Sequence, residues 1–275
     1  MSRWQAELET ARRLAREAGA LLLRYYRHAG RVIQKAGGSP QSEADRAANA
    51  YLVRALREAY PDDGLLAEES PDTMRRLDQA RVWMVDPLDG TREFLEGVAQ
   101  FVVQIGLVFE GRPVLGAVYQ PVLDKLYWGV VGEGAFLEHA GRTKPLQVSP
   151  RQALSTFRAV VSRSHRSPLT DRLLQALGIT QVVPLGSVGM KVAALVEQEA
   201  ELYLHPAGYT NLWDTAAPEA ILVAAGGLMT DCYGRPLDYS GREVKNRHGI
   251  LASNGVAHQE IVDRMAPLLE GAFKG

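Results

Sequence analysis

The sequence lacks the features of a secreted, membrane-spanning or disulfide-stapled protein. Its single cysteine, Cys232, excludes an internal disulfide and any zinc or iron–sulfur site built on several cysteines. The longest uncharged apolar stretch, from Ala220 to Met229, is far shorter than the roughly 18 apolar residues that a spanning helix needs. The first residues have no apolar signal-peptide core. We therefore expect a soluble, cytoplasmic protein with no membrane partner, in which Cys232 is a small buried residue.

An excess of charge of one sign is also missing. The 31 Lys and Arg residues balance 32 Asp and Glu residues, which leaves a formal net charge of −1. This balance argues against binding of nucleic acid through a broad basic face, although a local positive pocket could still hold a small anion. The sequence contains no G-x-G-x-x-G after a strand, no P-loop, no H-E-x-x-H and no G-x-S-x-G. Dinucleotide-binding, P-loop, zinc-protease and nucleophile-elbow chemistry therefore have no support.

What is present is an ordinary apolar fraction of 46%, arranged in two different patterns. The first half begins with two apolar-periodic helices, over residues 5–26 and 42–59, separated by a loop over 35–40. Ser42 is a plausible N-cap of the second helix, and Pro61 ends it. Short turns then separate successive β-rich runs, which predicts an antiparallel sheet with strands over 65–67, 81–85, 101–109, 113–119 and 125–131.

The second half alternates between strands and helices, which predicts α/β layering. The expected strands cover 158–162, 181–184, 201–205 and 250–252, and the expected helices 170–177, 187–198, 215–225 and 259–269. We predict an α+β N-terminal domain over 1–153 and an α/β C-terminal domain over 154–275.

The most informative motif is Asp86-Pro87-Leu88-Asp89-Gly90-Thr91, which follows a predicted strand and precedes a helical turn over 91–95. Pro87 disfavours helical geometry at Asp86, which is expected at the strand tip, and Gly90 lets backbone approach a ligand closely. Two carboxylates around such a turn can reach one Mg²⁺, and the N–H groups of a helix start can bind a phosphate. The alternative is plain turn chemistry with local side-chain bonds.

Two further acidic elements occupy similar places. Glu68-Glu69 follows a short apolar strand, and Glu69 is interpreted as a solvated loop residue. Asp214, in Trp213-Asp214-Thr215-Ala216-Ala217, opens a predicted helix, where a simple N-cap is the competing interpretation. Three acidic clusters at strand ends or helix starts together favour a functional site.

These motifs resemble the inositol monophosphatase superfamily of Mg²⁺-dependent, Li⁺-sensitive phosphatases. The resemblance covers nearly the whole chain and implies a layered α-β-α-β-α sandwich of the inositol monophosphatase and sugar phosphatase type. Within the superfamily, four segments look like the 3'(2'),5'-bisphosphate nucleotidase branch: Arg92-Glu93-Phe94, Ser162-Arg163-Ser164-His165, Gly186-Ser187-Val188-Gly189-Met190-Lys191 and Pro236-Leu237-Asp238-Tyr239.

The resemblance also implies a role for individual residues. One Mg²⁺ would bind Glu68, Asp86 and the Leu88 carbonyl. A second Mg²⁺ would bind Asp86, Asp89 and Asp214. Asp45 would support a third ion or orient the attacking water, and Thr91 is expected to act with it in catalysis. The N-terminal domain would thus hold most metal ligands and the C-terminal domain one. The expected substrate contacts are Glu68, Asp89, Gly90, Thr91, His165, Ser187, Lys191 and Asp214.

Lys191 and Ser187 are four residues apart on one predicted helix, so both can face a substrate. A phosphate that is not cleaved would pair with Lys191. The favoured reaction converts adenosine 3',5'-bisphosphate to AMP and phosphate. The alternatives are inositol monophosphatase or fructose-1,6-bisphosphatase activity and, from another class, a non-catalytic metal- or nucleotide-binding regulator. Monomer and homodimer both remain open.

Overall fold

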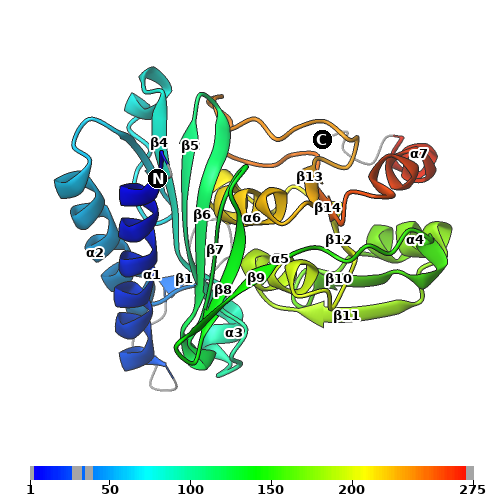
Figure 1. The fold of residues 1–275 in the computed structure, drawn as a ribbon, viewed down its shortest axis with the longest axis horizontal. Coiled ribbons are helices and arrows are strands. Elements are labelled where there is room, and N and C mark those ends of the chain that lie inside the picture. The colour runs from blue at the N-terminus through cyan, green and yellow to red at the C-terminus, as the bar shows by residue number, and fades with distance from the viewer. Residues whose placement is uncertain (1–2, 27–32, 35–39, 271–275) are drawn as a thin grey trace.

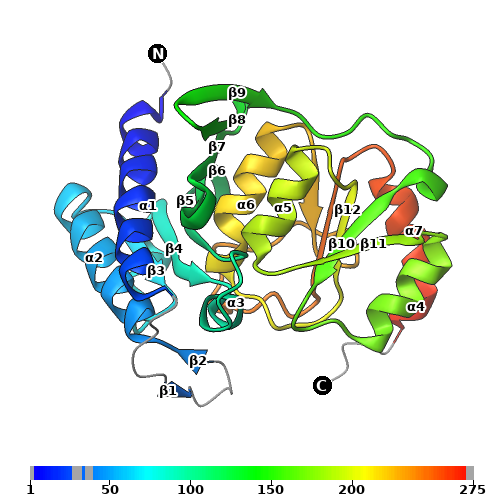
Figure 2. The same cartoon turned by 90° about the horizontal axis from the view of Figure 1, so that it is seen from below.

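Five layers of helices and sheets alternate across the molecule (Figure 1). The computed structural model describes residues 3–26, 33–34 and 40–270, so the predicted loop over 35–40 lies almost wholly outside it. Figure 2 shows the same order of layers from a second direction: a helix pair, a large sheet, a second helix pair, a smaller sheet and a third helix pair. The predicted α-β-α-β-α sandwich is confirmed.

The first sheet has seven strands, which neighbour one another in chain order. They are β3 (Gly64–Ala67), β4 (Arg81–Asp89), β5 (Val102–Phe109), β6 (Arg112–Gln120), β7 (Lys125–Val130), β8 (Gly134–His139) and β9 (Arg142–Leu146). Every pair is antiparallel, as predicted, except β3 and β4, which run parallel. The sequence analysis did not identify β8 and β9.

The helices α1 (Gln5–Tyr25) and α2 (Glu43–Ala59) cover the outer face of this sheet and match the two predicted helices. Their apolar stripes pack against the sheet in one core cluster, which includes Leu14, Leu52 and Ile105. Ser42 caps α2 as expected, and Asp45 Oδ2 accepts from the Ser42 N–H at 2.8 Å. The carboxylate of Asp45 is therefore part of the helix start.

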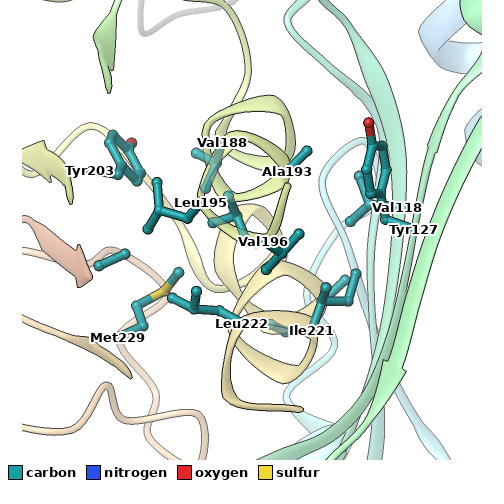
Figure 3. Packing of buried hydrophobic residues seen from close by; sticks show 14 of the residues in the cluster. Val118, Tyr127, Val188, Ala193, Leu195, Val196, Tyr203, Ile221, Leu222 and Met229 are labelled. Carbon is teal, nitrogen blue, oxygen red and sulfur yellow. The ribbon is translucent and has the colours of Figure 1, made fainter. Parts of the chain in front are cut away.

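The central helices α5 (Val188–Val196) and α6 (Leu212–Ala224) lie between the two sheets. Figure 3 shows their apolar side chains packed between Tyr127 of the large sheet and Tyr203 of the small one. Helix α6 approaches the large sheet so closely that a Cβ added to Gly116 would lie 2.2 Å from the Ala217 carbonyl oxygen. Glycine is required there, because any side chain would displace the helix.

The second sheet has the order β11-β10-β12-β14-β13 and is mixed. Its strands are β10 (Arg158–Ser162), β11 (Gln181–Leu185), β12 (Leu202–His205), β13 (Leu228–Thr230) and β14 (Ile250–Ser253), of which the last two pair antiparallel. Helices α4 (Pro168–Leu177) and α7 (His258–Leu269) pack on its outer face. Cys232 is buried in the apolar core between these helices and the second sheet, with a free thiol, as expected.

The predicted boundary near residue 153 falls between β9 and β10, where the chain passes from one sheet to the other. The division into two domains stays a prediction, since α5 and α6 from the second half share one core with Val102 and Val118 from the first. Among the described residues, no helix is long and apolar enough to cross a membrane.

Candidate active site

The acidic motif does not begin where the strand ends. Strand β4 continues to Asp89, and its pairing with β5 shifts register between Asp86 and Asp89. The prediction that Asp86 stands at the strand tip is therefore wrong by three residues. The cause is an irregularity around Pro87, which lacks the N–H that a regular ladder would use. Asp86 is only 1% exposed, and its Oδ1 accepts from the Leu88 N–H at 2.9 Å.

Gly90 ends the strand and begins the short helix α3 (Thr91–Leu95), which the sequence predicted. Its φ of 98° is in the region that favours glycine, and a Cβ there would lie 2.8 Å from the Gln100 carbonyl oxygen. Both observations explain why no other residue fits. The turn leaves the start of α3 open toward the acidic side chains.

The hydroxyl of Thr91 links the turn to the outer helix layer. Its Oγ1 is 3.3 Å from Asp45 Oδ1 and 3.2 Å from the Leu88 carbonyl oxygen. Gly90 holds the N-cap position, so the Thr91 hydroxyl does not cap α3. Burial raises the pKa of Asp45, although bonds from Ser42 oppose the rise.

Asp89 connects the two halves of the chain. Its Oδ2 accepts from the N–H groups of Val188 and Gly189 at 2.5 and 3.1 Å, and from Gln104 Nε2 at 3.1 Å. A carboxylate from the large sheet thus lies at the positive end of α5. Burial raises the pKa of Asp89 to about 6, although these N–H groups and the charge of Lys191 oppose the rise.

Helix α6 begins three residues earlier than predicted, so Asp214 lies within its first turn. The helix begins at Leu212 with Asn211 as N-cap, and Asp214 Oδ2 accepts from the Asn211 N–H at 2.6 Å. Asp214 therefore stabilises the helix start from its third position, and the simple N-cap interpretation is wrong.

Ten of the eleven predicted site residues line one cavity of about 570 Å³ between the two halves. Asp45 does not line it and reaches it only through Thr91. Glu69 is also outside the cavity, where it accepts a bond from Gln41 and is half-buried instead of fully solvated. The ten are Glu68, Asp86, Leu88, Asp89, Gly90, Thr91, His165, Ser187, Lys191 and Asp214.

The carboxylates in this cavity repel one another. Burial, followed by repulsion from Glu68, Asp89 and Asp214, raises the pKa of Asp86 well above its usual range. Burial and repulsion from Asp89 and Glu68 do the same to the pKa of Asp214. Such crowding is costly unless a cation lies between the groups.

The donor set fits a hard divalent cation. All candidate ligands are oxygens, from four carboxylates and the Leu88 carbonyl, and this is the donor type that Mg²⁺ prefers. In the described part of the chain, no three His, Cys, Asp or Glu side chains already surround a single metal position. Water and phosphate oxygens would have to complete the coordination, as is usual for Mg²⁺.

Lys191 is buried, with 3% exposure, so it is not a residue of the solvated helix face. Its ammonium donates to the carbonyl oxygens of Ser187, Gly186 and Leu185, the last two at 3.3 and 3.4 Å. Burial lowers the pKa of Lys191 to about 8. Three backbone oxygens thus lie within hydrogen-bond distance of the ammonium, and the contact of Lys191 with a phosphate stays a prediction.

Ser187 has strained backbone, with φ 44° and ψ 153°. Its hydroxyl caps α5 by accepting from the Met190 N–H at 2.8 Å. Non-glycine residues held in such sparsely populated conformations cluster at functional sites. The strain supports a role for this turn in binding.

Other residues of the cavity were missed by the sequence analysis. Aromatic rings lie near His165: its ring centroid is 5.9 Å from that of Tyr209, which is 6.3 Å from His205. Glu93 accepts from Ser164 Oγ at 2.7 Å and so joins α3 to the loop after β10. The resemblance already marked the segments of Glu93 and Ser164, but no local pattern distinguished Tyr209, His205, Asn211 or Lys245.

Residues 4–269 match the model of the inositol monophosphatase family, so the chain belongs to this family. It is 40% identical over 239 residues to the 3'(2'),5'-bisphosphate nucleotidase CysQ of Escherichia coli K12, a match that covers 86% of this chain and 95% of the relative.

Two solved structures extend the comparison. The inositol monophosphatase of Thermotoga maritima superposes with a TM-score of 0.82 at 26% identity, and covers 97% of this chain and 99% of its own. CysQ of Bacteroides thetaiotaomicron superposes with a TM-score of 0.78 at 30% identity, with coverage of 92% and 98%.

Proposed function

We propose that this protein removes the 3'-phosphate of adenosine 3',5'-bisphosphate, giving AMP and inorganic phosphate. Water attacks the phosphorus, the bond from phosphorus to the 3'-oxygen breaks, and that oxygen leaves as the ribose hydroxyl after it takes up a proton. No protein nucleophile is needed, since positioning and charge neutralisation carry phosphoryl transfer.

The observation that carries this proposal is the cavity itself. Five acidic side chains and the start of α3 line it, together with imidazole and phenol rings suited to a nucleoside. The 40% identity to a bisphosphate nucleotidase over most of both chains supports the same substrate class.

We infer that two or three Mg²⁺ ions are the cofactor. Glu68, Asp86 and the Leu88 carbonyl would hold one, and Asp86, Asp89 and Asp214 a second. When bound, Mg²⁺ lowers the pKa of water and neutralises phosphate charge. The chain itself presents the N–H groups at Gly90 and Thr91 to the transferred phosphate. Asp45 acts through Thr91, whose hydroxyl it positions.

His165 and Ser187 form the wall that meets the nucleoside in this proposal. Burial and the charge of Arg92 lower the pKa of His165, which favours the neutral ring, and a neutral ring can stack on a base or accept a hydrogen bond. Lys191 contributes positive charge beneath the same wall.

A phosphate-release assay with added Mg²⁺ tests the function. Adenosine 3',5'-bisphosphate should be hydrolysed with a higher kcat/KM than inositol 1-phosphate or fructose 1,6-bisphosphate. A preference for either of the other two would replace the proposed substrate with that one. Tight nucleotide binding with no phosphate release would favour a binding regulator.

Replacing Thr91 by Ala should lower kcat by roughly 10²-fold, the scale of a positioned acid–base contact. The hydroxyl lies between Asp45 and the Leu88 carbonyl, where it can orient a water. KM should change little, since the backbone N–H groups remain. Steady-state kinetics on the bisphosphate measure both constants.

The control for this prediction is Thr91→Ser, which keeps the hydroxyl and should retain most of kcat. Both variants should have similar thermal midpoints, because Thr91 does not cap α3. A fall in stability without a fall in kcat would assign Thr91 a structural role only.

A further inference from the structure

Three lysine or arginine side chains line the cavity: Arg92, Lys191 and Lys245. A bisphosphate substrate brings two anionic groups, and the second needs a cationic partner away from the acidic cluster. The Lys191 ammonium is buried and already donates to backbone carbonyls. The two remaining candidates are both exposed at the surface of the cavity.

Arg92 directly follows Thr91 on α3. Its charge acts on His165 and lies next to the turn that meets the phosphate to be cleaved. An arginine in that place attracts every phosphorylated substrate alike. It cannot explain a preference for a second phosphate.

Lys245 comes from a different segment, which is fastened to the start of α6. The Leu212 N–H donates to the Val244 carbonyl and the Asn246 N–H to the Thr210 carbonyl, both at 2.9 Å, and Lys245 pairs with Asn211 in an isolated antiparallel bridge. The backbone that carries Lys245 is thus held beside Asn211, itself part of the cavity wall.

The side chain of Asn246 secures this attachment. It is buried, and its Nδ2 lies within hydrogen-bond distance of Thr210 Oγ1 at 3.2 Å and of the Asn211 carbonyl oxygen at 3.1 Å. The position of Lys245 relative to Asp214 is therefore set by bonds on both sides. Its ammonium has no carboxylate or carbonyl partner within the residues that the structure describes, and it is exposed.

Other cations of the same loop differ from Lys245. Arg247 forms an ion pair with Glu243, and Arg242 lies outside the cavity. Among the described residues of this loop, Lys245 is the cation that lines the cavity and forms no ion pair with a carboxylate.

We propose that Lys245 binds the phosphate that is not cleaved and so makes the enzyme selective for bisphosphorylated nucleotides. This inference rests on the proposed function. Lysine suits the task, because its compact charge on a flexible stem can follow a phosphate without a fixed two-pronged geometry.

The test compares two substrates that share the cleaved group, adenosine 3',5'-bisphosphate and adenosine 3'-monophosphate. Lys245→Gln should lower kcat/KM for the bisphosphate roughly 10-fold, chiefly through KM, because the lost contact binds ground state and transition state equally. The monophosphate should be unaffected. Lys245→Arg should keep most of the preference, and Arg242→Gln, which removes a charge from the same loop, should change neither substrate.

Ionic strength gives a second measurement. The difference between wild type and Lys245→Gln on the bisphosphate should shrink as salt rises, because an exposed contact is screened. A role of Lys245 in holding the loop would not depend on salt in this way. Thermal midpoints of all variants should match the wild type, since the side chain is exposed.

Several results would overturn the inference. Equal losses on both substrates would place Lys245 in the shared machinery, and equal losses in Lys245→Gln and Arg242→Gln would indicate general attraction of anions by the loop. No loss on either substrate would leave Lys245 as a solvated residue. If the wild type hydrolyses inositol 1-phosphate but neither nucleotide, the proposed function itself is wrong. That result is read from the wild type alone and does not depend on the variants.

Discussion

Asp214→Asn is expected to reduce phosphate release to background while the folded protein becomes more stable in the absence of metal. Burial and repulsion raise the pKa of Asp214, so removing its charge relieves an unfavourable interaction. The asparagine oxygen can still accept from the Asn211 N–H. A gain of about 1 kcal/mol would raise the thermal midpoint by roughly 2–4 °C. Asp86→Asn and Asp89→Asn should also abolish turnover.

A carboxylate outside the cavity provides the control. Asp231 is buried but forms an ion pair with Arg235 at 2.9 Å and accepts from the N–H groups of Tyr233 and Arg235. Asp231→Asn should therefore lower the thermal midpoint and leave kcat unchanged. If Asp214→Asn behaves like Asp231→Asn, then Asp214 serves the helix start and not a metal.

Removal of divalent metal with EDTA should abolish activity, and added Mg²⁺ should restore it. The all-oxygen donor set predicts recovery with Mg²⁺, and by family resemblance we expect inhibition by Li⁺ and by excess Ca²⁺. Full turnover of the stripped protein would contradict the metal site.

Thermal denaturation tests metal binding at the same site without an activity assay. A ligand that binds only the folded state stabilises it by about 2.7 kcal/mol at 100 times its Kd. The midpoint of the wild type should rise with Mg²⁺ concentration, and that of Asp214→Asn should rise much less. An equal rise in both would place the bound ion elsewhere.

Local sequence patterns predicted most elements because those elements bury an apolar face. The helices α1 and α2 have such a stripe, and strands β5 to β7 are mainly apolar, although Gln104 interrupts β5. Strand β9 escaped detection because it is an exposed edge strand with the sequence Arg-Thr-Lys-Pro-Leu, which has no apolar period. Strand β13 has three residues, too few for a pattern.

The site residues were predictable where they lie next to one another in the sequence. Asp86, Asp89 and Gly90 form one local turn, and the motif therefore contained their arrangement. Tyr209 and Lys245 line the cavity because of tertiary contacts, such as the bridge from Lys245 to Asn211. No local sequence pattern in either segment predicts these contacts. The burial of Lys191 was not predictable for a related reason, since it results from the packing of α5 between the two sheets.

The position of α5 and α6 between the sheets has a consequence for synthesis on the ribosome. The last strand of the large sheet ends at Leu146. The two helices that cover the inner face of this sheet come later in the chain, between Val188 and Ala224. At roughly 5–20 residues per second, that apolar face stays uncovered for several seconds in the growing chain. The nascent N-terminal half is therefore the form of this protein most exposed to aggregation and most in need of a chaperone.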